Sequence, residues 1–460
     1  MNILAAIGYI INTYKEKTEE IAKKVGFKKR KGKIEALTFT LAITLCIGDL
    51  KEITLKTILR KCENIQDGLK ISKQGLFKRM EAGARLMEEL YKNIFNESSK
   101  NEFKSDYLSK LNQFDDVFLT DASTVSLPEK LEELYEGLGG KNANSALKIQ
   151  TTYSILQQKI TDLDLYSATK NDATYNKVTL SNIKENALYI KDLGYYSGKY
   201  FDEVEQNGAY YLSRIKSNTK LFEYNEKEDT YKEIDYCKMY RCNDSFIDEN
   251  CFIRLTGSKM LKVRLVCVKL PEDVISERLR KANKNAKKKK KALSKKEKLM
   301  LRWNVFITNV EEEKLDVETI CKLYRIRWQL ELLFKAMKTG LSFDNFGYAG
   351  INYFKCLLYG KLINLLMVTD LFAWSRNKLY VEFGRLVSIQ SFFKNIRPEM
   401  NKFIAIFKCG TDSIIIELEN IIMRIGKLSF FDKRKRKTSE EELMVDSSML
   451  PEKSEFKLVS

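Results

Sequence analysis

The sequence predicts an α/β protein with a mixed sheet at its centre, a β-rich insertion, and helical regions at both ends. Two observations lead to this prediction. Short β-like runs separated by helical stretches fill the middle of the chain, whereas apolar residues at helical spacing dominate before and after it. The 460 residues are 44% hydrophobic and include only 4 prolines, so the chain is able to bury a sizeable core.

A helical pattern dominates the first 110 residues. Residues 34–47 are apolar, residues 50–62 are amphipathic, and residues 72–90 begin at the N-cap candidate Ser72 and repeat apolar residues at helical spacing. The basic stretch at residues 27–33 lies between two of these helices. Such a stretch is more often a solvated face than a DNA contact, so by itself it identifies no binding surface.

From residue 114 onward the pattern changes to short β-like runs. We expect strands at residues 117–120, 148–155, 160–168, 188–191 and 209–215, and helices at residues 179–187 and 200–206. Strands that alternate with helices in this way favour a sheet with mixed connections.

A second β-rich segment follows at residues 216–271, and it is either an insertion or a separate small domain. Residues 276–301 form a lysine-dense helix or linker, residues 303–309 a further strand, and residues 317–339 a long helix. Helices fill most of the remainder. Residues 433–460 are a polar tail that is first basic and then acidic.

The charge and the missing histidine limit the possible functions. The chain has 80 Lys and Arg against 62 Asp and Glu, a net charge of +18, which favours a polyanionic partner such as nucleic acid. It has no histidine, which excludes Ser-His-Asp and Cys-His hydrolases and His-ligated metal sites. Its 9 cysteines include no CxxC pair, which argues against a zinc ribbon or a disulfide framework.

No targeting or membrane segment is predicted. The N-terminus lacks the pattern of a signal peptide, and no stretch reaches about 18 uninterrupted apolar residues. The most apolar stretch, residues 356–372, is interrupted by Lys361 and Asp370. We therefore expect a cytoplasmic protein that does not contact a membrane.

One helix carries an unusual stripe of polar residues. With Tyr324 at 0° on a helical projection, Arg327 falls near 300°, Glu331 near 340° and Lys338 near 320°, at about 100° per residue. Apolar residues flank this stripe, and charges held in an apolar surface are costly unless they are paired or bind an ion or a phosphate. The plainer alternative is an i,i+4 ion pair between Arg327 and Glu331 on a half-exposed helix.

Two aspartates favour the first interpretation. Asp121 ends one apolar strand and Asp192 ends another, and ligands gather at this edge of open α/β sheets. Together with Glu331, they would form an oxygen-rich cage suited to Mg²⁺ or Mn²⁺. Two such ions can activate an attacking oxygen and stabilise the leaving oxygen in phosphodiester displacement, and this chemistry needs no histidine.

At these positions the chain resembles the DDE transposases of bacterial insertion sequences, specifically the insertion sequence 4 family. Tyr324, Arg327, Glu331 and Lys338 match the spacing of that family's Tyr-Arg-Glu-Lys signature, and Asp121 and Asp192 match its two aspartates. The resemblance spans most of the chain and implies a ribonuclease-H-like mixed-sheet core that is interrupted by a β-rich insertion domain. It implies these domains: 1–110, a helical DNA-binding region; 111–215 and 301–345, the two parts of the catalytic core; 216–300, the β-rich insertion and basic linker; 346–432, a helical region; and 433–460, the tail.

The resemblance also implies roles for the site residues. Two Mg²⁺ ions, with Mn²⁺ as a substitute, would be bound by Asp121, Asp192 and Glu331, while Tyr324, Arg327 and Lys338 would hold the terminal phosphates. Charge-assisted bonds from Arg and Lys suit that task.

Three more residues are candidates for DNA contact. Trp303 matches a family aromatic that stacks on a flipped base, although a core tryptophan on a strand is the plainer interpretation. Arg214 and Lys216 follow a strand and are candidates for contact with the DNA backbone, although a solvated strand end explains them equally well.

The resemblance implies a cut-and-paste transposase that binds the transposon ends, cleaves them and joins the 3′-OH to target DNA as a synaptic homodimer. Two alternatives stay open at this stage. One is a metal-dependent nuclease on the same fold that performs no strand transfer, and the other is a non-catalytic DNA-binding derivative.

Overall fold

A computed structural model describes residues 3–28, 33–45, 53–100, 108, 111–139, 144–240, 244–408 and 412–431. Most of the basic stretch at residues 27–33, the start of the helix expected at residues 50–62, and the polar tail at residues 433–460 lie outside the described residues.

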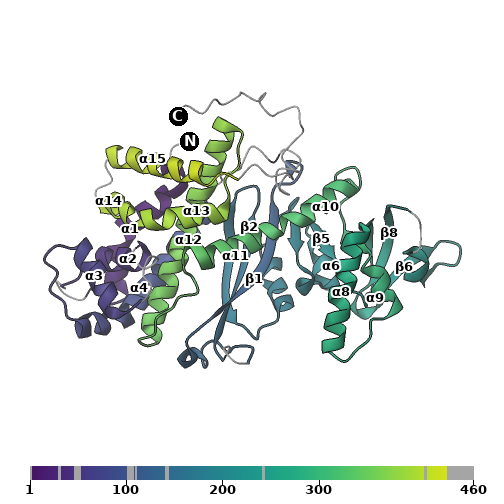
Figure 1. Ribbon diagram of the computed structural model, residues 1–460, viewed down its shortest axis with the longest axis horizontal. Coiled ribbons are helices and arrows are strands. Elements are labelled where there is room, and N and C mark those ends of the chain that lie inside the picture. Colours follow the sequence, from purple (N-terminus) through teal and green to yellow (C-terminus); the bar gives the residue numbers. More distant parts are fainter. Residues whose placement is uncertain are drawn as a thin grey trace.

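Helices from the two ends of the chain pack together into one body (Figure 1). From the N-terminal part come α1 (Leu4–Lys24), α2 (Ala36–Leu45), α3 (Leu55–Ile65) and α4 (Lys73–Ser99), and from the C-terminal part come α12 (Ile351–Phe383), α13 (Ile389–Ile396), α14 (Phe403–Lys408) and α15 (Asp412–Leu428). Ser72 caps α4, as expected, because its side chain accepts a hydrogen bond from the backbone N–H of Gly75 at 3.1 Å. The main apolar core joins this helical body to one face of the sheet.

The long helix α12 lies at the centre of that body. It is the one described helix that is long and apolar enough to cross a membrane, but 89% of its most apolar window is buried inside the protein. It packs against α1, α2, α4 and α15. Burial against other helices explains its apolar composition, since a core helix is hydrophobic all round.

A single sheet runs through the rest of the molecule. Its strands are β1 (Val117–Ser126), β2 (Ala146–Ser154), β3 (Lys159–Ser167), β4 (Leu188–Lys191), β5 (Tyr210–Arg214), β6 (Leu221–Asn225), β7 (Thr230–Glu233), β8 (Phe246–Arg254), β9 (Met260–Lys269) and β10 (Trp303–Thr308). The strand order is β3-β2-β1-β4-β5-β10-β9-β8-β6-β7. The β1–β4 and β4–β5 pairs are parallel and the others are antiparallel, so the predicted mixed sheet is confirmed.

The β-rich segment after residue 216 extends this sheet and forms no second one. Strands β6 to β9 continue the ladder through β10, which pairs with β5 on one side and with β9 on the other. For the described strands, this continuous sheet favours an insertion over a separate small domain. The boundaries proposed for the domains stay predictions.

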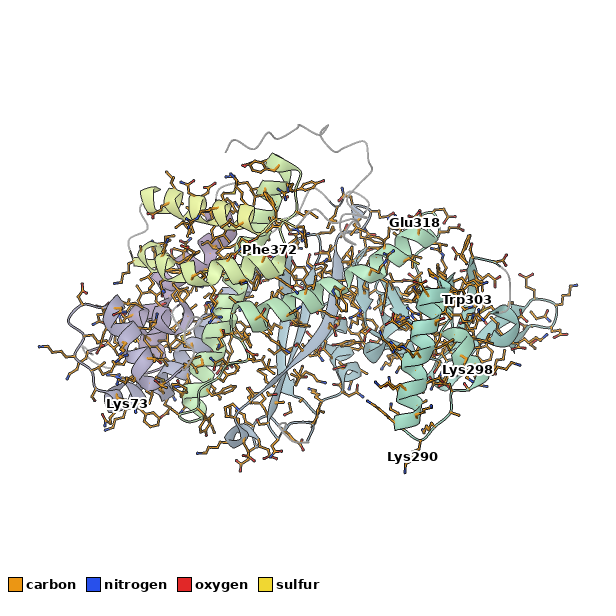
Figure 2. The ribbon with its side chains drawn as sticks, viewed as in Figure 1. Lys73, Lys290, Lys298, Trp303, Glu318 and Phe372 are labelled. Carbon is orange, nitrogen blue, oxygen red and sulfur yellow. The ribbon has the colours of Figure 1, made fainter. Side chains whose placement is uncertain are left out.

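The lysine-dense segment forms two helices, α8 (Glu272–Lys288) and α9 (Lys295–Met300). Helix α8 ends at Lys288, shortly before Lys290 adopts a left-handed backbone conformation. Helix α9 begins after its N-cap residue Ser294, which forms a capping box with Glu297. Figure 2 shows Lys290 at the outer edge of the molecule, beyond the sheet.

Two expected helices differ from those observed. In place of a helix at residues 179–187, the short α5 (Asn176–Leu180) ends early, and the following residues include Ser181, Asn182 and the left-handed Asn186, which favour turns. The helix expected at residues 317–339 is divided at Arg327 into α10 (Val317–Ile326) and α11 (Trp328–Gly340). The helix expected at residues 200–206 is α6 (Gly198–Gln206), and the short α7 (Tyr236–Met239) follows β7.

A candidate acid site built around Arg327

The sheet brings two of the predicted acidic residues together. Strands β1 and β4 are parallel, and their register pairs Thr120 with Lys191. The next residues along the two strands are Asp121 and Asp192, so both carboxylates arrive at the same edge of the sheet. Helix α11 packs across β1 and carries Glu331 in its first turn (Figure 1).

All three carboxylates contact one guanidinium. Arg327 Nη1 lies 3.0 Å from Asp121 Oδ2, Nη2 lies 2.8 Å from Glu331 Oε1, and Nε lies 3.6 Å from Asp192 Oδ1. The Arg327 side chain is only 16% exposed. The plainer i,i+4 ion pair therefore exists, but as one part of a larger arrangement in which residues from two strands and a helix meet.

Burial and charge act against each other at Asp121. Burial raises the pKa of its carboxyl to about 6, although the backbone N–H of Ala122 and the charge of Arg327 both lower it. The neighbouring carboxylates of Asp192 and Glu331 add to the rise. Burial by itself lowers the pKa of Arg327, but the surrounding acidic groups outweigh that effect and raise it. The guanidinium thus stays charged and keeps the carboxylates together.

The donors of this site suit a hard cation. They are three carboxylates that converge on one point, and one of them has a raised pKa because its charge lacks solvation. As they stand, the described residues hold no group of three acidic or thiol side chains arranged to bind a metal ion. The positive charge that balances these carboxylates comes from Arg327.

Tyr324 and Lys338 flank the carboxylates. The Tyr324 hydroxyl donates to Asp192 Oδ1 at 3.4 Å, and burial together with the charge of Asp192 raises its pKa. Lys338 Nζ donates to the backbone oxygen of Thr124 on β1 at 2.8 Å. Thr124 is the third residue after Asp121 on β1, so Lys338 is held by the backbone of the strand that carries Asp121, at a point further along that strand.

Arg214 is the last residue of β5 and Lys216 follows it by two residues, and their side chains contact different parts of the chain. The Arg214 guanidinium stands 6.0 Å from the ring centre of Tyr324. Lys216 Nζ lies 3.5 Å from the backbone oxygen of Tyr196, in the loop that follows Asp192. Lys216 also lines a cavity of about 540 Å³ together with Lys220 and Arg254, which gives that cavity a basic wall.

Trp303 is a core residue in this structure. Its side chain is 2% exposed and stacks on Tyr240, with ring centres 5.9 Å apart. Figure 2 shows Trp303 inside the half of the molecule that contains β5 to β10. Its indole nitrogen is buried, and no described residue accepts a hydrogen bond from it. A base could stack on this ring only after Tyr240 had moved, so its role in base stacking stays a prediction.

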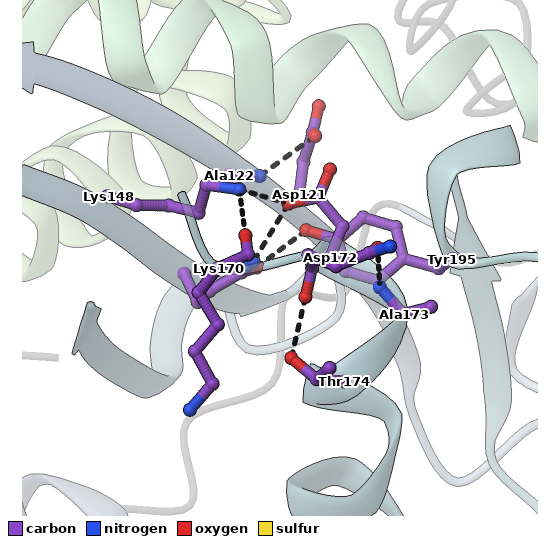
Figure 3. Close-up of polar contacts among 10 residues, drawn as sticks. Asp121, Ala122, Lys148, Lys170, Asp172, Ala173, Thr174 and Tyr195 are labelled. Atoms are coloured by element: carbon purple, nitrogen blue, oxygen red, sulfur yellow. Dashed lines mark hydrogen bonds and ion pairs between the residues drawn. The ribbon is translucent and has the colours of Figure 1, made fainter. Parts of the chain in front are cut away.

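A polar network beside the aspartates was missed by sequence reasoning (Figure 3). Asp172 Oδ1 accepts from Lys148 at 2.9 Å and from Gln150 at 3.2 Å, and the Gln150 side-chain oxygen accepts from the Tyr195 hydroxyl at 2.5 Å. This network ties β2 to the loop that carries Asp192. One signal was present in the sequence: the polar residues 150–152 lie in the middle of an expected strand, and the structure buries all three of them.

Comparisons with known proteins show the family of the chain. Residues 112–367 match the family described as "Transposase DDE domain". The transposase for insertion sequence element IS231F of Bacillus thuringiensis subsp. israelensis is 28% identical over 372 residues, which cover 76% of each protein. The transposase for insertion sequence element IS1151 of Clostridium perfringens is 28% identical over 374 residues, which cover 78% of each.

Among solved structures, a piggyBac transposase synaptic complex with hairpin DNA aligns with a TM-score of 0.45 and 10% identity, over 94% of this chain and 87% of that one. The family match is the decisive comparison, because it spans more than half of the chain and contains both aspartates, the glutamate and Arg327. This chain belongs to the transposase DDE domain family.

Proposed function

We propose that this transposase is a cut-and-paste enzyme of the insertion sequence 4 type, which cleaves the ends of its own element and joins the 3′-OH to target DNA. The observation that carries the proposal is the convergence of Asp121, Asp192 and Glu331 on one buried guanidinium. A protein that only binds DNA has no need of three carboxylates at the same point, since they repel phosphate. The order and directions of β1 to β5 in the sheet support the proposal that these strands form a ribonuclease-H-like core.

The chain's own residues would divide the work as follows. Asp121, Asp192 and Glu331 would hold two Mg²⁺ ions, or Mn²⁺ in their place, and these ions when bound would polarise the attacking and leaving oxygens. Arg327 would then turn from the carboxylates to the phosphate of the DNA, since its fork suits both groups. Tyr324 and Lys338 would hold neighbouring phosphates from the two sides of the carboxylates.

The proposal also includes the partners of this protein and its location in the cell. The substrate would be double-stranded DNA, at the transposon ends and at the target, and a homodimer would bring two ends together. The net charge of +18 supports association with DNA. We place the protein in the bacterial cytoplasm, at the nucleoid.

Replacing Glu331 with glutamine tests the function. Glu331→Gln should abolish cleavage while binding to end DNA stays within about twofold, because the change removes one charge and keeps the shape of the side chain. The assay follows labelled transposon ends with Mg²⁺ and a target plasmid. Glu318→Gln is the matched control, since Glu318 lies on α10 with its side chain 76% exposed and should leave activity unchanged.

Three outcomes would contradict the proposal in different ways. Cut ends that never join a target would identify a nuclease without strand transfer. A Glu331→Gln variant that cuts as well as the unaltered protein would show that this carboxylate is not catalytic. An unaltered protein that binds ends but never cuts them would identify a DNA-binding derivative.

A further inference from the structure

Arg278 makes contacts with β10 that are separate from those of the acid site. It belongs to α8, the lysine-rich helix, and reaches back to the sheet, where its Nη2 donates to Asn304 Oδ1 at 2.8 Å. Its Nη1 lies 3.4 Å from the backbone oxygen of Trp303. One arginine of this basic helix is therefore fixed against β10, whereas the lysines around it are mostly exposed.

A second arginine shares the same acceptor. Arg214 Nη2 lies 3.5 Å from Asn304 Oδ1, so two guanidinium groups meet at one amide oxygen. Arg214 and Asn304 project from the same face of the sheet as Phe306, because Arg214 pairs with Phe306 and Asn304 lies two residues before it. Phe306 packs against Tyr324, so this is the face covered by α10.

A chain of contacts leads from this pair to the acid site. The Arg214 guanidinium stands 6.0 Å from the ring centre of Tyr324, and the hydroxyl of that ring donates to Asp192. The Tyr324 side chain thus separates Arg214 from Asp192, and Arg278 lies beyond Arg214, on the side toward β10 and α8.

The charge of this pair is not balanced. Within the described part of the chain, neither Arg214 nor Arg278 has a carboxylate partner, and the contacts of Arg278 are a carbonyl oxygen and an amide oxygen. Burial lowers the pKa of Arg278, and the nearby charge of Arg214 lowers it further. Two half-buried cations side by side repel each other, and an anion between them would remove that cost.

We propose that Arg214, Arg278 and Asn304 form a binding site for one backbone phosphate of the DNA strand whose cleavable phosphate lies at the carboxylates. The proposal rests on the proposed function and adds Arg278 to its DNA contacts. A phosphate fits because two guanidinium forks and an amide N–H offer donors to its oxygens. A base fits less well, because the neighbouring aromatic ring, Trp303, is buried and offers no free face.

The first test measures how salt weakens the binding of DNA. The probe is a labelled duplex with the sequence of the DNA end that flanks this gene, in buffer without Mg²⁺ so that no cutting occurs. Arg278→Gln should bind roughly tenfold more weakly and reduce the log–log salt slope by about 0.9, the value for one phosphate that is no longer neutralised. Arg280→Gln is the matched control, because Arg280 is exposed and lies about 200° around α8 from Arg278.

A double substitution tests whether the two arginines hold the same phosphate. If they do, Arg214→Gln and Arg278→Gln together should cost less affinity than the sum of the two single effects, since the first change already removes much of the site. Additive effects would overturn the shared site, and an unchanged slope in Arg278→Gln would overturn the phosphate contact itself.

Arg278→Lys separates charge from structure. It keeps the charge, so it should retain the salt slope while binding several-fold more weakly, because a lysine cannot form the fork. Thermal unfolding of each variant shows whether α8 still packs on the sheet. If Arg278→Gln is too unstable to assay, a lysine variant with unaltered affinity would by itself reject a site specific for guanidinium.

Failure of this proposal is distinguishable from failure of the proposed function. An unchanged slope in Arg278→Gln, in a preparation whose unaltered protein cuts and joins ends, rejects only the phosphate site. An unaltered protein that fails to cut, but whose DNA binding still depends on Arg278, rejects only the proposed function.

Discussion

Arg327 supplies the positive charge around which three acidic side chains are arranged. It contacts residues that are 206, 135 and 4 positions away along the chain, and the register of two parallel strands aligns the first two of them. A carboxylate cluster without such a cation would be partly protonated at neutral pH, because like charges at short range raise one another's pKa. The guanidinium therefore favours the ionised form of these acids.

Arg327→Gln should make stability depend on pH. Removing the guanidinium raises the pKa of Asp121 in the folded state above its present value of about 6, so the folded protein binds more protons than the unfolded chain near neutral pH. Stability should then fall as pH rises, by about 1–3 kcal/mol at pH 8 relative to the unaltered protein and by less at pH 5. Urea unfolding at both pH values measures this, with the exposed Arg325→Gln as control. Equal decreases at the two pH values would contradict it.

Asp370 on α12 gives a second pH dependence, away from the acid site. It accepts a hydrogen bond from Tyr9, and burial raises its pKa to about 7. The pKa of Asp370 is higher in the folded protein than in the unfolded chain. The contribution of Asp370 to stability is therefore greatest below about pH 4, and it is lost as pH rises through 7. Asp370→Asn should therefore be more stable than the unaltered protein by about 1–3 kcal/mol at pH 8, with no gain at pH 4. Thermal unfolding at the two pH values measures this, and a pH-independent difference would contradict it.

Among single residues, the sequence identified polar residues that recur at helical spacing within one segment of the chain. The stripe of Tyr324, Arg327 and Glu331 was predictable, because these residues are close in the chain and the backbone stays helical at Arg327, where α10 and α11 meet. The contacts of Gln150 with Tyr195, and of Arg278 with Asn304, join separate elements and depend on how helices and loops lie on the sheet. No local pattern encodes such a contact.

At the scale of elements, α11 is held in place by close packing at its C-terminal end. A Cβ atom on Gly340 would lie 2.7 Å from Phe393 Cβ and 2.9 Å from its backbone carbon, so α13 sits directly against the glycine. This contact fixes the position of the helix that carries Glu331 and Lys338 over β1.

Gly340→Ala should destabilise the protein by about 1–3 kcal/mol, because the backbone of α13 has no flexible side chain to move aside. Cleavage should fall as well, since a shift of α11 moves Glu331 away from the aspartates. Gly8→Ala in α1 is the matched control: its new Cβ would meet only Leu4 Cβ at 3.8 Å, so it should be neutral or stabilise the helix by up to about 1 kcal/mol. Thermal unfolding that ranks the two variants in the opposite order would contradict this view of the packing.

Helices and strands in which apolar residues recur at a regular spacing were predictable, whereas the residues at which they end were less so. Strand β4 agrees with its expected residues, and β1 runs past Asp121 to Ser126 because β2 continues to pair with it there. The helix expected at residues 317–339 is interrupted at Arg327, where no proline or glycine warns of a break. The continuation of the sheet through β10 was not predictable, since it joins strands far apart in the chain.

At the scale of the whole molecule, charge is unevenly distributed. The acid site is compact, whereas the lysines of α8 and of the turn after it are exposed, and Figure 2 shows one of them, Lys290, at the edge of the molecule. DNA that reaches the carboxylates from that side would pass the basic helix first. Part of the net charge of +18 is therefore concentrated on α8 and the turn after it.

Replacing Lys287 to Lys291 with glutamine should weaken binding to any DNA sequence alike and reduce the log–log salt slope by about 0.9 for each phosphate that is no longer neutralised. These lysines are exposed and carry no base-specific geometry, so discrimination between end DNA and random DNA should stay unchanged. Titrations with both duplexes over a range of salt measure this. An unchanged slope would show that these lysines are only solvated.

The position of β10 in the sheet also matters for how the protein is made. Residues 303–308 fill the gap between β5 and β9, although they are synthesised after both strands. On the ribosome, β5 therefore remains an open edge, and the two aspartates have no guanidinium opposite them until α10 has followed. Translation that stops before residue 303 leaves a product in which β5 is an aggregation-prone edge and the two aspartates lack their guanidinium partner. The acid site is therefore completed late, when Arg327 and Glu331 have been synthesised.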